Sequence, residues 1–254
     1  MELRHWVRVA VAGGLLPVLI AWSSASTTPA RRPPVPAPGY HHLGATTQDA
    51  WSGVLGRMSV GDPDVRAGSF DFVATRFMAK ADTPGGVTWL EAGWAETGWA
   101  GDGRQRIYTY DTNTGHWTFY DQYPIAAGDR IWIELTATRP AAGAVAPDTS
   151  APDTSASWSA WLWWHDGWHL LTSQQLPIAE HATIEEYVEV YVDPARGGSI
   201  AVPTVQVDNV QLQRDPAAGM EYWTDDIGTS PGDGTDGYCL AFPQPYVTWV
   251  AGSC

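Results

Sequence analysis

The chain has 254 residues and a formal net charge of −14, with 28 Asp and Glu against 14 Lys and Arg. This balance argues against a nucleic-acid surface, because phosphate binding needs clustered Lys and Arg and Lys80 is the only lysine. With 44% apolar and 17% charged residues the chain can bury a sizeable core, which excludes wholesale disorder. Its 15 Trp residues are more than a core of this size needs.

The first thirty residues have the order of a secretory signal peptide. Arg4 and Arg8 precede an apolar stretch over 9–21, and small residues follow up to Ala25. The apolar stretch is shorter than the roughly 20 residues that span a bilayer, so a retained membrane anchor is the weaker alternative. We expect removal of residues 1–30, a secreted, extracellular protein and no membrane association after cleavage.

Two further features concern the ends of the mature chain. Residues 31–45 begin with a Pro-rich run and are expected to form a linker to a single domain over 46–254. Cys239 and Cys254 are the only cysteines, and in an oxidising compartment they predict one disulfide that pins the C-terminal tail. A metal site at these cysteines is disfavoured, because no His lies beside them at ligand spacing.

The hydrophobic pattern between these ends has a period of two and no helical stripe. Runs rich in Val, Ile, Thr, Tyr, Phe and Trp are separated by Gly, Asp, Asn or Pro, and Asp166-Gly167 indicates a hairpin turn. This pattern predicts an all-β, antiparallel β-sandwich. The nine predicted strands cover 69–80, 87–96, 104–111, 117–123, 130–138, 157–164, 168–175, 183–193 and 204–213.

Two carboxylates interrupt apolar strands and are candidate functional residues. Glu186 lies on the even-numbered face of the 183–193 strand, which is otherwise aliphatic, and Glu91 is a single acid within an apolar run. A buried carboxylate raises its pKa or needs a partner, so such positions often belong to functional sites. The alternatives are a Glu186 that reaches water at a strand end and a Glu91 that pairs with a buried Arg.

The segments around these residues resemble glutamic peptidases. Trp89-Leu90-Glu91-Ala92-Gly93-Trp94 is similar to the I-E-A-G-W segment that carries one catalytic glutamate of the neprosin family. Residues 120–124 and 128–131 are similar to the Y-E-W-Y-P and G-D-x-I motifs of eqolisins, and Glu186-Tyr187-Val188 to their catalytic E-W-I segment. The resemblance covers roughly residues 51–215 and implies a concanavalin-like β-sandwich of jelly-roll type.

The resemblance implies an acid-acting endopeptidase with Glu91 and Glu186 as the catalytic pair. It also places Trp89, Asp121 and Tyr123 beside a peptide or protein substrate, and it requires no metal and no cofactor. If the odd-numbered face of the strand lines the cleft, Glu185 or Glu189 replaces Glu186.

Departures from both families leave other functions open. Neprosin's second glutamate has no counterpart after Trp168, and eqolisins keep a Trp on the strand where this chain has Thr75-Arg76-Phe77. A catalytically degenerate relative is therefore one alternative. Another is a non-catalytic, lectin-like sandwich that binds polysaccharide, since flat Trp rings stack on sugar faces.

Overall fold

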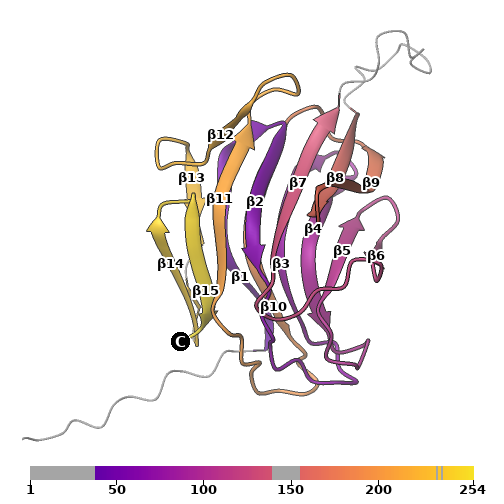
Figure 1. The fold of residues 1–254 in the computed structure, drawn as a ribbon, viewed down its shortest axis with the longest axis vertical. Helices are drawn as coiled ribbons and strands as arrows, with labels where there is room; N and C mark the ends of the chain where they lie inside the picture. Colours follow the sequence, from indigo (N-terminus) through magenta and orange to yellow (C-terminus); the bar gives the residue numbers. More distant parts are fainter. Residues whose placement is uncertain (1–37, 139–154, 233, 236) are drawn as a thin grey trace, which may run out of the picture. The chain divides into compact units, whose positions relative to one another are not determined.

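The computed structural model describes residues 38–138, 155–232, 234–235 and 237–254. The predicted signal peptide and residues 31–37 of the predicted linker lie outside these residues. All regular secondary structure in the described part is β-strand, arranged in two antiparallel sheets (Figure 1). The described residues include no helix long and apolar enough to cross a membrane. The prediction of an antiparallel β-sandwich is confirmed.

The seven-stranded sheet has the order β13-β1-β10-β3-β4-β5-β6. Strand β10 lies between β1 and β3, and it pairs with both although it comes much later in the chain. The bounds of these strands are β1 Gly39–Trp51, β3 Phe72–Thr83, β4 Gly86–Thr97, β5 Arg106–Asp111, β6 His116–Phe119, β10 Ala182–Val192 and β13 Thr229–Pro231.

The eight-stranded sheet has the order β14-β15-β11-β2-β7-β8-β9, and β12 pairs with β11 outside this path. Its strands are β2 Gly53–Ser59, β7 Arg130–Thr138, β8 Ala156–Trp164, β9 Gly167–Leu176, β11 Val205–Gln213, β12 Met220–Tyr222, β14 Tyr238–Gln244 and β15 Thr248–Ser253.

All nine predicted strands are present, with ends that differ by a few residues. The β8–β9 turn lies one residue earlier than predicted, because Trp164 pairs with Gly167 and His165 has a φ of 55°. The sequence pattern missed β1, β2 and β12–β15. Residues 39–45, which the predicted linker included, belong to β1, where alternate side chains such as Leu43 and Ala45 are buried.

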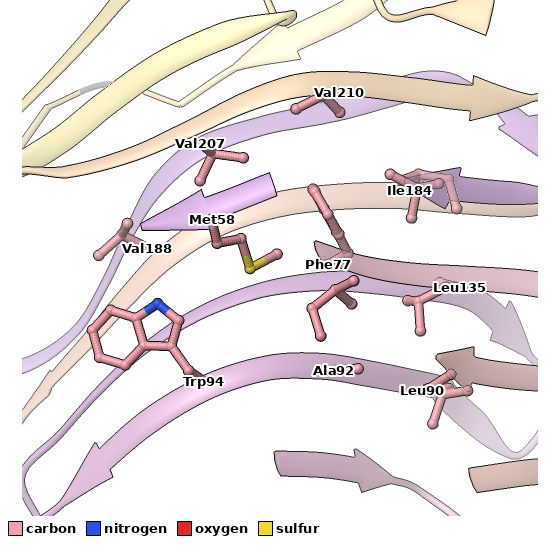
Figure 2. Packing of buried hydrophobic residues seen from close by; sticks show 14 of the residues in the cluster. Met58, Phe77, Leu90, Ala92, Trp94, Leu135, Ile184, Val188, Val207 and Val210 are labelled. Atoms are coloured by element: carbon pink, nitrogen blue, oxygen red, sulfur yellow. The ribbon is translucent and has the colours of Figure 1, made fainter. Parts of the chain in front are cut away.

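The core lies between the two sheets and is built from alternate residues of each strand. Figure 2 shows Phe77, Leu90 and Ala92 of the seven-stranded sheet packed in the same layer as Met58 and Leu135 of the eight-stranded sheet. Since successive residues of a strand point to opposite faces, the neighbours of these core residues point away from the other sheet. That outer face of the seven-stranded sheet carries the candidate site.

The surplus of Trp is divided between the core and the outer faces. Five Trp side chains are at most 2% exposed and fill the core: Trp51, Trp94, Trp158, Trp223 and Trp249. The indole N–H of Trp94 donates to the Ser59 carbonyl at 3.0 Å, so this buried polar group is satisfied. The remaining described Trp residues are partly or largely exposed and are available to line binding surfaces.

The predicted disulfide between Cys239 and Cys254 is present and joins the strands of the β14–β15 hairpin. It closes a loop with a sequence separation of 15 residues, for which chain entropy gives about 3 kcal/mol of stabilisation.

We expect replacement of both cysteines by Ser to lower the free energy of unfolding by about 3 kcal/mol, because the unfolded chain regains the freedom of this loop. Urea denaturation of the oxidised protein and of the double variant measures the difference. Equal midpoints and slopes would show that the disulfide does not stabilise the fold.

Candidate active site

The outer face of the seven-stranded sheet contains a cleft made of two adjoining hollows. The first has a volume of about 450 Å³, the second about 400 Å³, and they share His42, Arg76, Met78 and Trp89. The first is completed by Tyr40, Phe72, Glu91, Tyr110, Trp117 and Glu189. The second is completed by Lys80, Val87, Glu185 and Tyr187.

Strand alternation and register bring the charged side chains together. Glu91 lies between the core residues Leu90 and Ala92, so it points outward, and it is paired in register with Met78 of β3. On β10 the odd-numbered residues face the cleft, as the register of Glu185 opposite Met78 shows. The odd face, which was the alternative in the sequence analysis, therefore lines the cleft.

Arg76 is the centre of this cluster. Its guanidinium is 2% exposed, and its Nε lies 3.3 Å from Oε2 of Glu91 and 2.7 Å from Oε2 of Glu189. Its Nη1 lies 3.3 Å from Glu185, and the guanidinium stands over the ring of Tyr187. Because one nitrogen lies 3.3 and 2.7 Å from the two carboxylate oxygens, these are at most about 6.0 Å apart.

The environment of Glu91 favours its protonated form. Burial raises the pKa of Glu91 to about 7; the charge of Arg76 opposes this rise, while the nearby Glu189 adds to it. The hydroxyl of Tyr108 donates to Oε1 of Glu91 at 3.3 Å, and Tyr108 is itself fully buried. At mildly acid pH the Glu91 carboxyl carries a proton.

The environment of Glu189 favours its ionised form. Burial raises its pKa, but Arg76 and His42 outweigh burial and lower the pKa of Glu189 to about 2. Nε2 of His42, from the adjacent β1, lies 3.7 Å from Oε1 of Glu189. Two neighbouring carboxyl groups, one with a raised pKa and the other with a lowered pKa, are suited to act as an acid and a base.

Glu186 lies on the other side of the sheet. Its side chain is 0% exposed between the two sheets, where the indole N–H of Trp249 donates to Oε2 at 2.7 Å, while Oε1 has no hydrogen-bond partner among the residues that the structure describes. The structure does not bring Glu186 together with Glu91, because residues 186 and 189 of one strand point to opposite faces. The cleft therefore contains Glu91 and Glu189, and Glu186 of the predicted pair lies outside it.

Burial raises the pKa of Glu186 well above its usual value, and the hydrogen bond from Trp249 only partly opposes this. Ionisation of Glu186 therefore lowers the free energy of unfolding. This loss is absent below pH 4.5, the pKa of the group in the unfolded chain. Above that pH it grows by about 1.4 kcal/mol per pH unit, until the pH reaches the pKa of Glu186 in the folded protein.

We expect Glu186→Gln to be more stable than the wild type above pH 4.5, because Gln still accepts the Trp249 hydrogen bond and does not ionise. Thermal melting at pH 4, 6 and 8 measures the difference in melting temperature between the variant and the wild type, and this gap should widen with pH. A gap that is constant over this range would contradict a protonated Glu186.

Of the three predicted substrate-binding residues, one lines the cleft and two do not. Trp89 lines both hollows and stacks on Tyr110 with ring centroids 5.6 Å apart. Asp121 is largely exposed and pairs with Arg106, and Tyr123 packs against Trp164. Neither Asp121 nor Tyr123 lines the cleft.

Sequence reasoning missed the roles of Arg76, His42 and Tyr108. Arg76 is a single charge within the apolar run 72–79, which is the same pattern that marks Glu91 and could have identified it. His42 and Tyr108 carry no such signal, because their role depends on the pairing of β1 with β10 and of β4 with β5.

Comparison with known proteins supports the fold. A crystal structure of scytalido-glutamic peptidase with a transition-state analogue inhibitor matches with a TM-score of 0.53 and 14% identity, over 87% of this chain and 100% of that chain. The chain shares the fold of scytalido-glutamic peptidase. A structure of SCP-B, a member of the Eqolisin family of peptidases, in complex with the tripeptide Ala-Ile-His has a TM-score of 0.46 at 14% identity, with the same coverage.

No family model and no curated protein sequence matches the chain. The similarity to scytalido-glutamic peptidase confirms the part of the predicted resemblance that concerns the fold: the chain has a glutamic-peptidase-like β-sandwich.

Proposed function

We propose that the protein is a secreted, acid-acting glutamic endopeptidase in which Glu91 and Glu189 form the catalytic pair. The observation that carries this proposal is the shared contact of both carboxylates with Nε of Arg76 in an open cleft, with their pKa values moved in opposite directions. The fold shared with scytalido-glutamic peptidase supports it.

In the proposed mechanism Glu189 is the general base. Its ionised carboxylate takes a proton from a water molecule as the oxygen of that water attacks the scissile carbonyl carbon. The protonated Glu91 donates a hydrogen bond to the carbonyl oxygen and stabilises the negative charge that develops there. When the tetrahedral intermediate collapses, the proton held by Glu189 passes to the leaving amine and the C–N bond breaks.

Arg76 and Tyr108 position this pair. Arg76 holds both carboxylates and stabilises the ionised state of Glu189, while Tyr108 fixes the other oxygen of Glu91. Burial alone would lower the pKa of Arg76, but the charges of Glu189, Glu91 and Glu185 outweigh burial and raise it, so Arg76 stays charged throughout the acid range.

The shape of the cleft supports a peptide substrate and cleavage within a chain. The hollows extend to both sides of Arg76, so substrate residues can bind on both sides of the scissile bond. Aromatic side chains such as Trp89, Tyr110 and Trp117 line one end and fit apolar substrate side chains. A glutamate at position 91 is the neprosin-like feature of the proposed pair.

The proposal predicts cleavage of a denatured protein between about pH 2 and pH 7. Below the pKa of Glu189, about 2, the base becomes protonated; above the pKa of Glu91, about 7, the acid loses its proton. Rates should fall about tenfold per unit beyond either limit.

Initial rates of peptide release from a reduced, carboxymethylated protein between pH 1.5 and 9 test this prediction. Cleavage confined to the alkaline range, or no cleavage at any pH by the folded protein, would refute the peptidase assignment. The second outcome is the one expected of a catalytically degenerate relative.

A further inference from the structure

The outer face of the eight-stranded sheet carries a second aromatic surface, on the layer opposite the cleft. Trp132, Trp163 and Trp168 are paired in register across β7, β8 and β9, and Trp161 is paired with Leu170 in the next row. We call these five residues the Trp face. Trp163 is 40% exposed, Trp168 38% and Leu170 49%, so this apolar surface meets solvent.

The rings of the Trp face form a corner rather than a flat stack. Trp163 and Trp168 have ring centroids 5.6 Å apart and planes at 79°, so they present two perpendicular surfaces. The guanidinium of Arg57 lies 5.5 Å from the centre of the Trp132 ring and fixes it. A hollow of about 310 Å³, lined in part by Trp163, Arg130 and His165, continues from this corner.

Polar groups without charge partners border the rings. Glu134 is paired in register with Trp161, is half-buried, and makes no hydrogen bond or ion pair with any residue that the structure describes. Burial raises the pKa of its carboxyl. Beyond it, Thr136, Ser159 and Ser173 form a row of hydroxyl groups across the same three strands.

The charges of this face match a neutral ligand. Arg57 and Arg130 both pair with Asp208, at 2.8 and 2.7 Å, so neither cation is free to hold a phosphate or an acidic lipid headgroup. In a two-fold dimer through this face, the Glu134 carboxyls of both copies would be buried without partners, at a cost of several kcal/mol. A ligand that donates hydroxyl groups satisfies Glu134 without that cost.

We propose that the Trp face binds a neutral polysaccharide. The C–H faces of the sugar rings stack on Trp163 and Trp168, and the sugar hydroxyls hydrogen-bond to Glu134, Thr136 and the exposed Ser173, while Ser159 is buried and bonded to Ser173. Trp132 and Trp168 lie two inter-strand spacings apart, with β8 between them, which is a span of about 10 Å, so the face is long enough for more than one sugar unit. This site is independent of the proposed peptidase activity.

Retention of the full chain on insoluble, neutral polysaccharides tests the proposal, with microcrystalline cellulose, insoluble xylan and chitin as probes. The variant combines Trp163→Ala with Trp168→Ala, and the control is Phe70→Ala, which removes another exposed aromatic (69%) that lies outside the strands of this sheet. We expect the wild type and the control to be retained on at least one polymer. The double variant should bind at least about tenfold more weakly.

Other outcomes overturn the proposal. The proposal is wrong if the wild type is retained on none of the three polymers. It is also wrong if the wild type and the double variant are retained equally. Sedimentation that shows a dimer lost in the double variant would assign the face to self-association. Binding to phosphatidylcholine vesicles in place of the polymers would assign it to a lipid surface. Trp168→Tyr, which keeps an aromatic ring, should retain most of the binding if stacking is the cause.

Discussion

Glu189→Gln is expected to abolish peptide cleavage, with kcat/KM about a thousandfold lower than in the wild type at pH 4. The amide fills the same volume in the cleft but cannot take a proton from water. Glu91→Gln should lose activity to a similar degree, because the amide N–H is a much weaker acid than the carboxyl O–H and stabilises the oxyanion less. Steady-state cleavage of a fluorogenic peptide measures both effects.

Glu186→Gln is the matched control, since it makes the same chemical change on the same strand. Glu186 is fully buried between the sheets and has no path to a substrate, so this variant should keep activity within about threefold of the wild type. If Glu186→Gln is inactive while folded and Glu189→Gln is active, the catalytic pair proposed here is wrong. Thermal melting of each variant separates a loss of catalysis from a loss of folding.

Arg76→Met is expected to have the largest effect on stability of any single change in the cleft. Removal of the guanidinium leaves Glu91, Glu185 and Glu189 close together without their shared counter-ion, which costs about 3–5 kcal/mol. The loss should be larger at pH 7 than at pH 4, because protonation at low pH relieves the repulsion between carboxylates. Denaturant unfolding at the two pH values measures it.

We expect the same residue to set the pH range of the proposed activity. Arg76 is the main favourable charge that lowers the pKa of Glu189, so its removal raises that pKa and moves the acid limit of the rate profile upward from about 2. Arg76→Lys keeps a charge and should restore part of the range and of the stability. An acid limit that is unchanged in a folded Arg76→Gln variant would show that Arg76 does not set the ionisation of Glu189.

The fold was predictable because its strong signals are local. Alternation within strands such as β4 and β10 is a property of about ten consecutive residues, and these two strands are predicted with small errors at their ends, whereas β1, of 13 residues, is missed. The short strands β12 and β13 have three residues each, too few to establish a period, and exist only because β11 and β1 pair with them. Such strands depend on tertiary pairing and leave no local pattern.

The site was predictable only in part. Glu91 stands out because it is an acid in an apolar run, and it lines the cleft. Glu186 gave the same signal, yet its face of β10 is the core, where Trp249 of the opposite sheet donates a hydrogen bond to the carboxyl. Sequence alternation shows which residues share a face, but it does not show which face is buried when both contain apolar and acidic residues.

The position of β10 also determines when the cleft is complete during folding. Arg76 and Glu91 belong to the β3–β4 hairpin, which pairs neighbouring segments, whereas Glu189 is 113 residues from Arg76 and reaches it only when β10 inserts between β1 and β3. Closing such a long loop is slow compared with forming a hairpin. A nascent or truncated chain that ends before β10 therefore contains Glu91 but not Glu189, so the proposed catalytic pair is completed only after the β3–β4 hairpin has formed.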